Sequence, residues 1–141
     1  MIGLDTNVLV RFIVRDDPDQ ALAASRLVNE VLSPENKGFI SSVVICELTW
    51  VLRKVLKVSK EGILSVINML LDSSSFTIEH RECVSYAVRD YANGEADFSD
   101  YYLAEIGCET GCLTATFDEK ALRHPHFKRV RSFLKNDESN F

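Results

Sequence analysis

Two aspartates directly follow predicted strands. Asp5 ends the apolar run of residues 1–4, and Asp118 follows the strand expected at residues 113–117. In an open α/β sheet, ligands bind at the carboxyl ends of the strands. Both side chains are therefore candidates for a site at that edge.

Two further acids lie in predicted helices. Glu47 is in the first half of the apolar segment 42–56, where a carboxylate needs an explanation because unpaired carboxylates are rarely buried. A salt bridge or a surface position explains it as well as a metal ligand or a base that points into a cleft. Asp100 falls in the first turn of a helix that Ser99 or Asp97 caps, where the helix dipole favours negative charge.

The four acids together favour a hard metal ion. If the strands before Asp5 and Asp118 are neighbours, the carboxylates of Glu47 and Asp100 converge on them and the group repels itself. Mg²⁺ or Mn²⁺ relieves this repulsion, because these ions take oxygen ligands and need only one or two direct carboxylates. Such a site suits hydrolysis of a phosphodiester by a metal-activated water.

Other chemistries have weaker support. The sequence has neither a P-loop nor a GxGxxG pattern. Cys108 and Cys112 lack a second pair, and we expect ordinary packed thiols. His124 and His126 flank Pro125 in a polar loop, so we expect surface residues or phosphate contacts.

The elements that position these residues alternate along the chain. We predict helices between strands at 1–4, 39–40, 76–79 and 113–117, with Thr6 or Asn7 as the cap of the first helix, Ser41–Ser42 before the third and Ser59 before the fourth. This order predicts the α/β class, with a mostly parallel sheet of four to five short strands flanked by helices. The 141 residues are expected to form one domain, 1–141.

Composition is typical of a globular chain, with 46% hydrophobic and 26% charged residues. No apolar run is long enough to span a bilayer and no signal peptide is evident, so we expect the cytoplasm. The net charge is -5, yet residues 120–135 carry six basic residues and no acid. A solvated tail and a phosphate-contacting surface explain this stretch equally well, and Lys128, Arg129 and Arg131 are the candidates for phosphate contacts.

Four motifs resemble the PIN-domain ribonucleases, specifically the VapC-type toxins of toxin–antitoxin pairs. They are LDTNVLVR at 4–11, ICELTWVL at 45–52, ADFSDYYLAEIG at 96–107 and TATFDEKAL at 114–122. The resemblance implies a three-layer fold and a quartet formed by Asp5, Glu47, Asp100 and Asp118. Within it, Asp5 and Asp100 are the main metal ligands, and Glu47 and Asp118 are further candidates. Asp97 shares the metal or only caps its helix, and the supporting residues are Thr6, Asn7 and Thr116.

The same resemblance implies partners. VapC-like toxins are held inactive by a VapB-like antitoxin and form homodimers, and the helices at 18–32 and 42–56 are candidates for the antitoxin groove, although a core role is their default. The main alternative is a catalytically idle PIN-like module that binds RNA or protein. A phosphatase with an Asp5 nucleophile fits less well, because Asn7 stands where such enzymes place a second aspartate.

Overall fold

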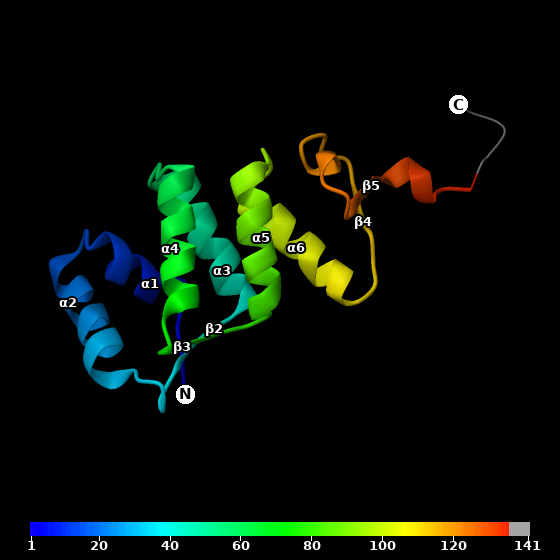
Figure 1. The fold of residues 1–141 in the computed structure, drawn as a ribbon. Coiled ribbons are helices and arrows are strands. Elements are labelled where there is room, and N and C mark those ends of the chain that lie inside the picture. Colours follow the sequence, from blue (N-terminus) through cyan, green and yellow to red (C-terminus); the bar gives the residue numbers. More distant parts are fainter. Residues whose placement is uncertain (136–141) are drawn as a thin grey trace. The chain divides into compact units, whose positions relative to one another are not determined.

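Short strands and helices alternate along residues 1–135, the part of the chain that the computed structural model describes (Figure 1). The chain divides into two compact units, Met1–Ser85 and a second unit that starts at Tyr86, within helix α5. In order, the elements are β1 (Ile2–Gly3), α1 (Thr6–Val14), α2 (Pro18–Arg26), the π-helical turn η1 (Leu27–Val31), β2 (Gly38–Ile40), α3 (Ser42–Trp50), the π-helical turn η2 (Val51–Val55), α4 (Lys60–Asp72), β3 (Phe76–Ile78), α5 (Arg81–Asn93), α6 (Phe98–Glu109), β4 (Thr114–Thr116), the 3-10 helix η3 (Ala121–Arg123), β5 (Phe127–Arg129) and the 3-10 helix η4 (Val130–Phe133).

The first unit holds a parallel sheet in the order β1-β2-β3 (Figure 1). The register pairs Gly3 of β1 with Phe39 of β2. Because the strands are parallel, their carboxyl ends share one edge of the sheet. Asp5, Ser41 and Glu79 follow β1, β2 and β3 at that edge.

Capping residues determine where the helices of this unit begin. The expectation that Thr6 or Asn7 caps α1 was wrong, because the helix begins at Thr6 and Asp5 itself is the N-cap. Asp5 keeps an extended backbone, and its Oδ1 accepts a hydrogen bond from the N–H of Thr6 at 2.8 Å. Ser41 and Ser59 cap α3 and α4 as predicted.

Segment 42–56 is less buried than its apolar composition indicates. Val43 and Trp50 are 66% and 58% exposed, and Glu47 lies on the same exposed stripe, since helical residues four and seven apart share a face. The opposite side of the helix packs into the core. The largest fully buried side chains of the first unit are Leu9, Ile40, Ile45, Leu48, Leu52, Ile63, Ile67, Leu70 and Val84.

The second unit contains α6 and a parallel strand pair, β4 with β5. Strand β5 lies inside the basic stretch 120–135 and was not predicted, because in its three residues only Phe127 is buried and no alternation is visible. The α/β class with short parallel strands is confirmed. No helix in residues 1–135 is long and apolar enough to cross a bilayer.

Candidate functional site

The first acidic group lies at the carboxyl edge of the β1-β2-β3 sheet. Asp5 is exposed and, as the N-cap of α1, stands at the positive end of a helix. Thr6 is buried, with 4% of its surface exposed, and its hydroxyl donates a hydrogen bond of 2.7 Å to Oε2 of Glu47. Two acids that are far apart in the sequence are thus tied to the same helix start.

Glu47 has no ion pair within residues 1–135, so a salt bridge is not its explanation. It occupies an exposed position on α3, and Thr6 fixes one of its two carboxylate oxygens. Asn7 is exposed and lines the groove between α1 and α2 with Arg11 and Gln20.

The second acidic group gathers at the start of α6. Asp97 is the N-cap, as the capping prediction requires, and Asp100 is the third helical residue. The backbone N–H of Asp97 donates to Oδ2 of Asp100 at 3.2 Å, and the N–H of Asp100 donates to the carbonyl of Asp97 at 3.0 Å. Asp100 is partly buried, and the hydrogen bond from Asp97 holds its carboxylate at the helix start.

Asp118 adds its charge to this group. Its backbone N–H donates to the hydroxyl of Thr116 at 3.0 Å, and its Oδ1 accepts hydrogen bonds from the N–H groups of Lys120 and Ala121 at 2.8 and 3.1 Å. Thr116 therefore supports the loop that carries Asp118.

The pKa of Asp100 is raised by its surroundings. Burial raises the pKa of Asp100, the charges of Asp97 and Asp118 raise it further, and only the hydrogen bond from Asp97 opposes them. A carboxyl whose pKa is raised by neighbouring carboxylates lies where a cation would be stabilised. The donors are all oxygens, which fits Mg²⁺ or Mn²⁺. Asp97, Asp100 and Asp118 do not bring three carboxylate oxygens within 4.8 Å of one another in the described residues, so full coordination by these acids alone requires movement or water.

Comparisons with known proteins identify the family. A model of the PIN domain family matches residues 2–128. The chain belongs to the PIN domain family. Comparisons with curated proteins and with solved structures found no match. PIN domains are generally nucleases, typically bind a divalent metal and are associated with RNA, and the match includes all four acids that the sequence singled out.

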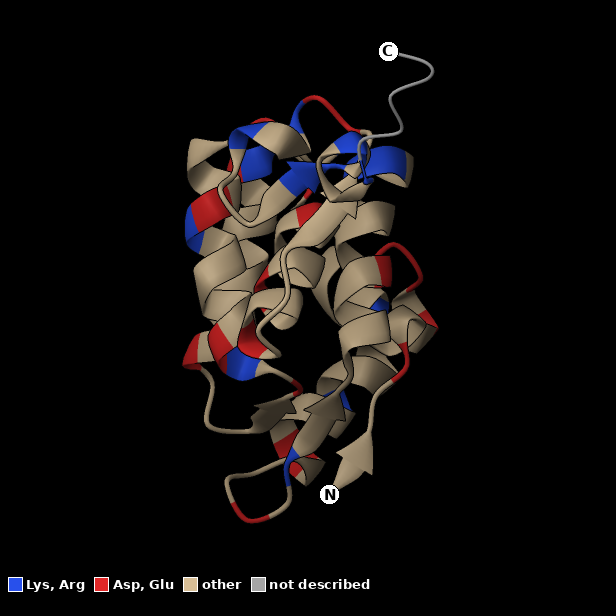
Figure 2. Cartoon of the chain, turned by 90° about the vertical axis from the view of Figure 1, so that its right-hand side faces the viewer, with Lys and Arg blue, Asp and Glu red and all other residues tan. Residues whose placement is uncertain are grey.

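Basic side chains of this PIN domain follow Asp118 in the sequence. Figure 2 shows Lys and Arg gathered on the strand pair and the short helices after α6. Lys128 and Arg129 are on β5 and Arg131 is in η4, and all three are exposed. The guanidinium of Arg129 forms a two-pronged contact with Glu119, at 2.6 and 3.0 Å. Part of the charge of this surface is therefore already balanced within the PIN domain.

A buried polar cluster was missed by the sequence argument. Asp90 of α5, Glu105 of α6, His124 and His126 form this histidine–carboxylate cluster. The expectation of surface histidines was wrong for His124, whose side chain is only 13% exposed. Burial, and then the neighbouring Asp90 carboxyl, raise the pKa of Glu105 to about 7. A glutamate inside the apolar run of residues 101–106 was the available signal, the same one that drew attention to Glu47.

The four cysteines belong to neither of the two acidic groups nor to the histidine–carboxylate cluster. All four are free thiols, and Cys108 and Cys112 are exposed rather than packed as predicted. Cys108 lies in the last turn of α6, and Cys112 follows Gly111, which adopts a positive φ of 81° where the chain turns toward β4.

Proposed function

We propose that this PIN domain is a metal-dependent endoribonuclease that acts in the cytoplasm as the toxin of a VapBC-type pair. The observation that carries the proposal is the acidic group at the start of α6, where burial and then the neighbouring carboxylates raise the pKa of Asp100, in a chain that the PIN model matches over residues 2–128. Such a group is unfavourable without a cation and useful with one. A catalytically idle module has no comparable use for it.

The proposed metal ligands are Asp5 and Asp100, with Glu47, Asp118 and Asp97 as further candidates. A bound Mg²⁺ or Mn²⁺ supplies a nucleophilic water at neutral pH and neutralises charge on the phosphate. The protein's own residues position the acids: Thr6 orients the Glu47 carboxylate, and Thr116 supports the backbone at Asp118. Asn7 is also proposed as a supporting residue, although within residues 1–135 its side chain forms no hydrogen bond to an acid.

RNA contacts are proposed for Lys128, Arg129 and Arg131. A strand that approaches a carboxylate-rich site must pass a region of negative potential, and positive side chains nearby offset that repulsion. All three side chains are exposed and follow Asp118 closely in the sequence. Because Arg129 is bound to Glu119, we expect it to contribute less than Lys128.

A VapB-like antitoxin and a homodimer are part of the same proposal. Apolar side chains that a lone domain leaves in water support it. Leu22 on α2 is 59% exposed, and Val43 and Trp50 on α3 are 66% and 58% exposed. A groove of about 360 Å³ lies between α1 and α2, lined by Asn7, Val8, Arg11, Gln20, Ala23, Ala24 and Leu27.

RNA cleavage by the purified chain tests the proposal. We expect cleavage with Mg²⁺ or Mn²⁺, none with a chelator, and none in Asp5→Asn or Asp100→Asn. Each of these acids also accepts a backbone hydrogen bond, and asparagine retains an accepting oxygen and caps helices as well as aspartate. Both variants should therefore fold, and Asp100→Asn should be at least as stable as the parent because a repelling charge is removed.

Asp72→Asn is the matched control, because Asp72 is an exposed acid at the end of α4. It makes the same chemical change outside both acidic groups and should leave cleavage intact. Retained cleavage in both Asp5→Asn and Asp100→Asn contradicts the assignment. RNA binding without any metal-dependent cleavage in the parent supports the idle module instead.

A further inference from the structure

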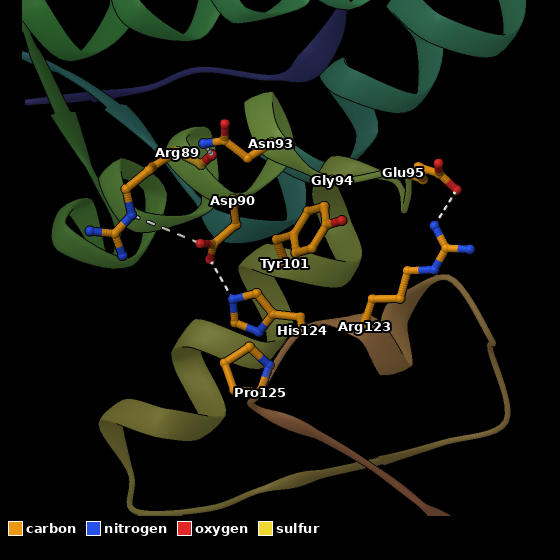
Figure 3. A pocket seen from close by; sticks show the side chains of 9 residues that line it. All are labelled: Arg89, Asp90, Asn93, Gly94, Glu95, Tyr101, Arg123, His124 and Pro125. Atoms are coloured by element: carbon orange, nitrogen blue, oxygen red, sulfur yellow. Dashed lines mark hydrogen bonds and ion pairs between the residues drawn. The ribbon is translucent and has the colours of Figure 1, made fainter.

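The histidine–carboxylate cluster joins three parts of the second unit. Nε2 of His124 lies 3.1 Å from Oδ2 of Asp90 and 3.8 Å from Oε1 of Glu105, and Nε2 of His126 lies 3.7 Å from the same Glu105 oxygen. Figure 3 shows His124 and Asp90 directed toward each other at the wall of a pocket. The two imidazoles and Glu105 place one donor atom each within 4.8 Å of one another.

Local backbone structure holds the two histidines on one side. Pro125 separates them and favours an extended conformation in the residue before it, which His124 adopts with φ −90° and ψ 136°. Residues 124–126 then form a turn that leads into β5, and the ring centroids of His124 and His126 lie 4.8 Å apart. The carbonyl of His126 accepts a hydrogen bond from Thr114 at 2.9 Å and that of His124 accepts one from Phe127 at 3.1 Å, so the segment is anchored to β4 and β5.

Burial makes the charge of this cluster costly. Glu105 is 7% exposed and the Asp90 side chain 10% exposed. Oδ2 of Asp90 is buried and has no hydrogen bond of good geometry among the described residues. Arg89 approaches the other Asp90 oxygen only at 3.9 Å, and its own side chain is 67% exposed. With both acids ionised and both imidazoles neutral, the cluster carries two negative charges that a dication would cancel.

We propose that Glu105, His124 and His126 form a second metal site of this chain, for a transition-metal dication of the Zn²⁺ class, with Asp90 within reach as a fourth donor. Two imidazoles with carboxylate oxygens are a donor set that Zn²⁺ prefers and that Mg²⁺ does not. Donors of a tetrahedral Zn²⁺ lie about 3.4 Å apart at the usual bond lengths. The contacts of 3.7 and 3.8 Å to Glu105 are already close to that spacing.

Access and protonation are compatible with this site. A cavity of about 320 Å³, lined in part by Asp90, Tyr101 and His124, opens beside the cluster and offers a route for the ion (Figure 3). Nδ1 of His124 accepts a hydrogen bond from the backbone N–H of His126 at 3.3 Å. A cation at Nε2 requires the imidazole proton at Nδ1, so this long hydrogen bond is exchanged for a metal bond.

The competing account is a metal-free cluster closed by protons, in which Glu105 and Asp90 share a proton and His124 pairs with Asp90. Direct metal binding separates the two accounts. The full chain, stripped with chelator and then dialysed, is titrated with Zn²⁺ by calorimetry and with Co²⁺ by its visible absorption, which reports tetrahedral coordination. The background variant Cys108→Ser/Cys112→Ser removes the exposed thiols, which could bind Zn²⁺ independently.

In that background we expect one equivalent of Zn²⁺ and a tetrahedral Co²⁺ spectrum. Glu105→Gln and His126→Gln should each weaken binding by at least about tenfold, an effect that even the outer partners of metal ligands produce. His80→Gln, at the remaining histidine of the chain, should leave binding unchanged. Asp5→Asn/Asp100→Asn should also retain it, which separates this site from the proposed nuclease centre.

Two results overturn the proposal. One is the absence of stoichiometric Zn²⁺ binding in the folded background variant. The other is unchanged Zn²⁺ affinity in both Glu105→Gln and His126→Gln. Since the His126 side chain is 30% exposed, His126→Gln should fold even if Glu105→Gln does not, and circular dichroism checks this for each variant.

Discussion

Glu105→Gln should convert a pH-dependent stability into a nearly pH-independent one. Burial and the neighbouring Asp90 carboxyl raise the pKa of Glu105 from its usual 4.5 to about 7 in the folded chain. The folded state therefore binds a proton that the unfolded state releases. The stability contributed by this proton is complete below pH 4.5 and is lost as the pH rises through 7.

The size of the effect follows from that difference in pKa. At about 1.36 kcal/mol per pKa unit, the full loss above pH 7 is roughly 3 kcal/mol, which is an upper bound because Arg89, His124 and His126 also face the cluster and respond to its charge. Of this loss in the free energy of unfolding, about 1 kcal/mol is expected between pH 6 and pH 8. Glutamine has nearly the same shape and no charge. The free energy of unfolding of Glu105→Gln, relative to that of the parent, should therefore rise by that amount between pH 6 and pH 8.

Urea unfolding followed by circular dichroism measures the effect, with chelator present so that no metal contributes. Both pH values lie above the isoelectric point of about 5.2. The matched control is Glu35→Gln, since Glu35 is an exposed loop acid and its substitution should follow the parent at both pH values. If the parent and Glu105→Gln change in parallel between pH 6 and pH 8, Glu105 does not hold the proton and the reasoning is refuted.

Three further predictions concern the proposed nuclease. Thr6→Val removes the 2.7 Å hydrogen bond to Glu47, so it should lower the free energy of unfolding by about 1 kcal/mol and reduce cleavage. Thr6→Ser retains the hydroxyl and should keep both the stability and the cleavage of the parent. Equal behaviour of the two variants argues against a role for this hydrogen bond. Asp118→Asn keeps the oxygen that accepts backbone hydrogen bonds and should reduce the cleavage rate less than Asp5→Asn does; an equal or larger loss would reverse that order. In a cleavage-dead form, Lys128→Ala should reduce the salt slope of RNA binding by roughly 0.7, and Arg129→Ala by less because of its carboxylate partner; an unchanged slope for Lys128→Ala removes β5 from the RNA surface.

Signals within a few residues of one another were read correctly from the sequence. The serines that cap α3 and α4, the short parallel strands and the position of Asp100 in the first turn of α6 all follow from local spacing. Cap and strand preferences depend on contacts between near neighbours in the chain, so the sequence contains them directly. The motifs that resembled PIN-domain ribonucleases were sufficient to predict the family.

Tertiary structure decided the environment of each acid. Only the fold brings the Thr6 hydroxyl to Glu47, and only burial together with Asp97 and Asp118 raises the pKa of Asp100. The sequence by itself determined where carboxylates stand on strands and helices. It did not determine which of them are shielded from water, because burial depends on segments that are distant in the chain. For the same reason the sequence did not single out Glu105, His124 and His126 as a cluster. Only the packing of α5, α6 and the β4–β5 pair places their side chains together.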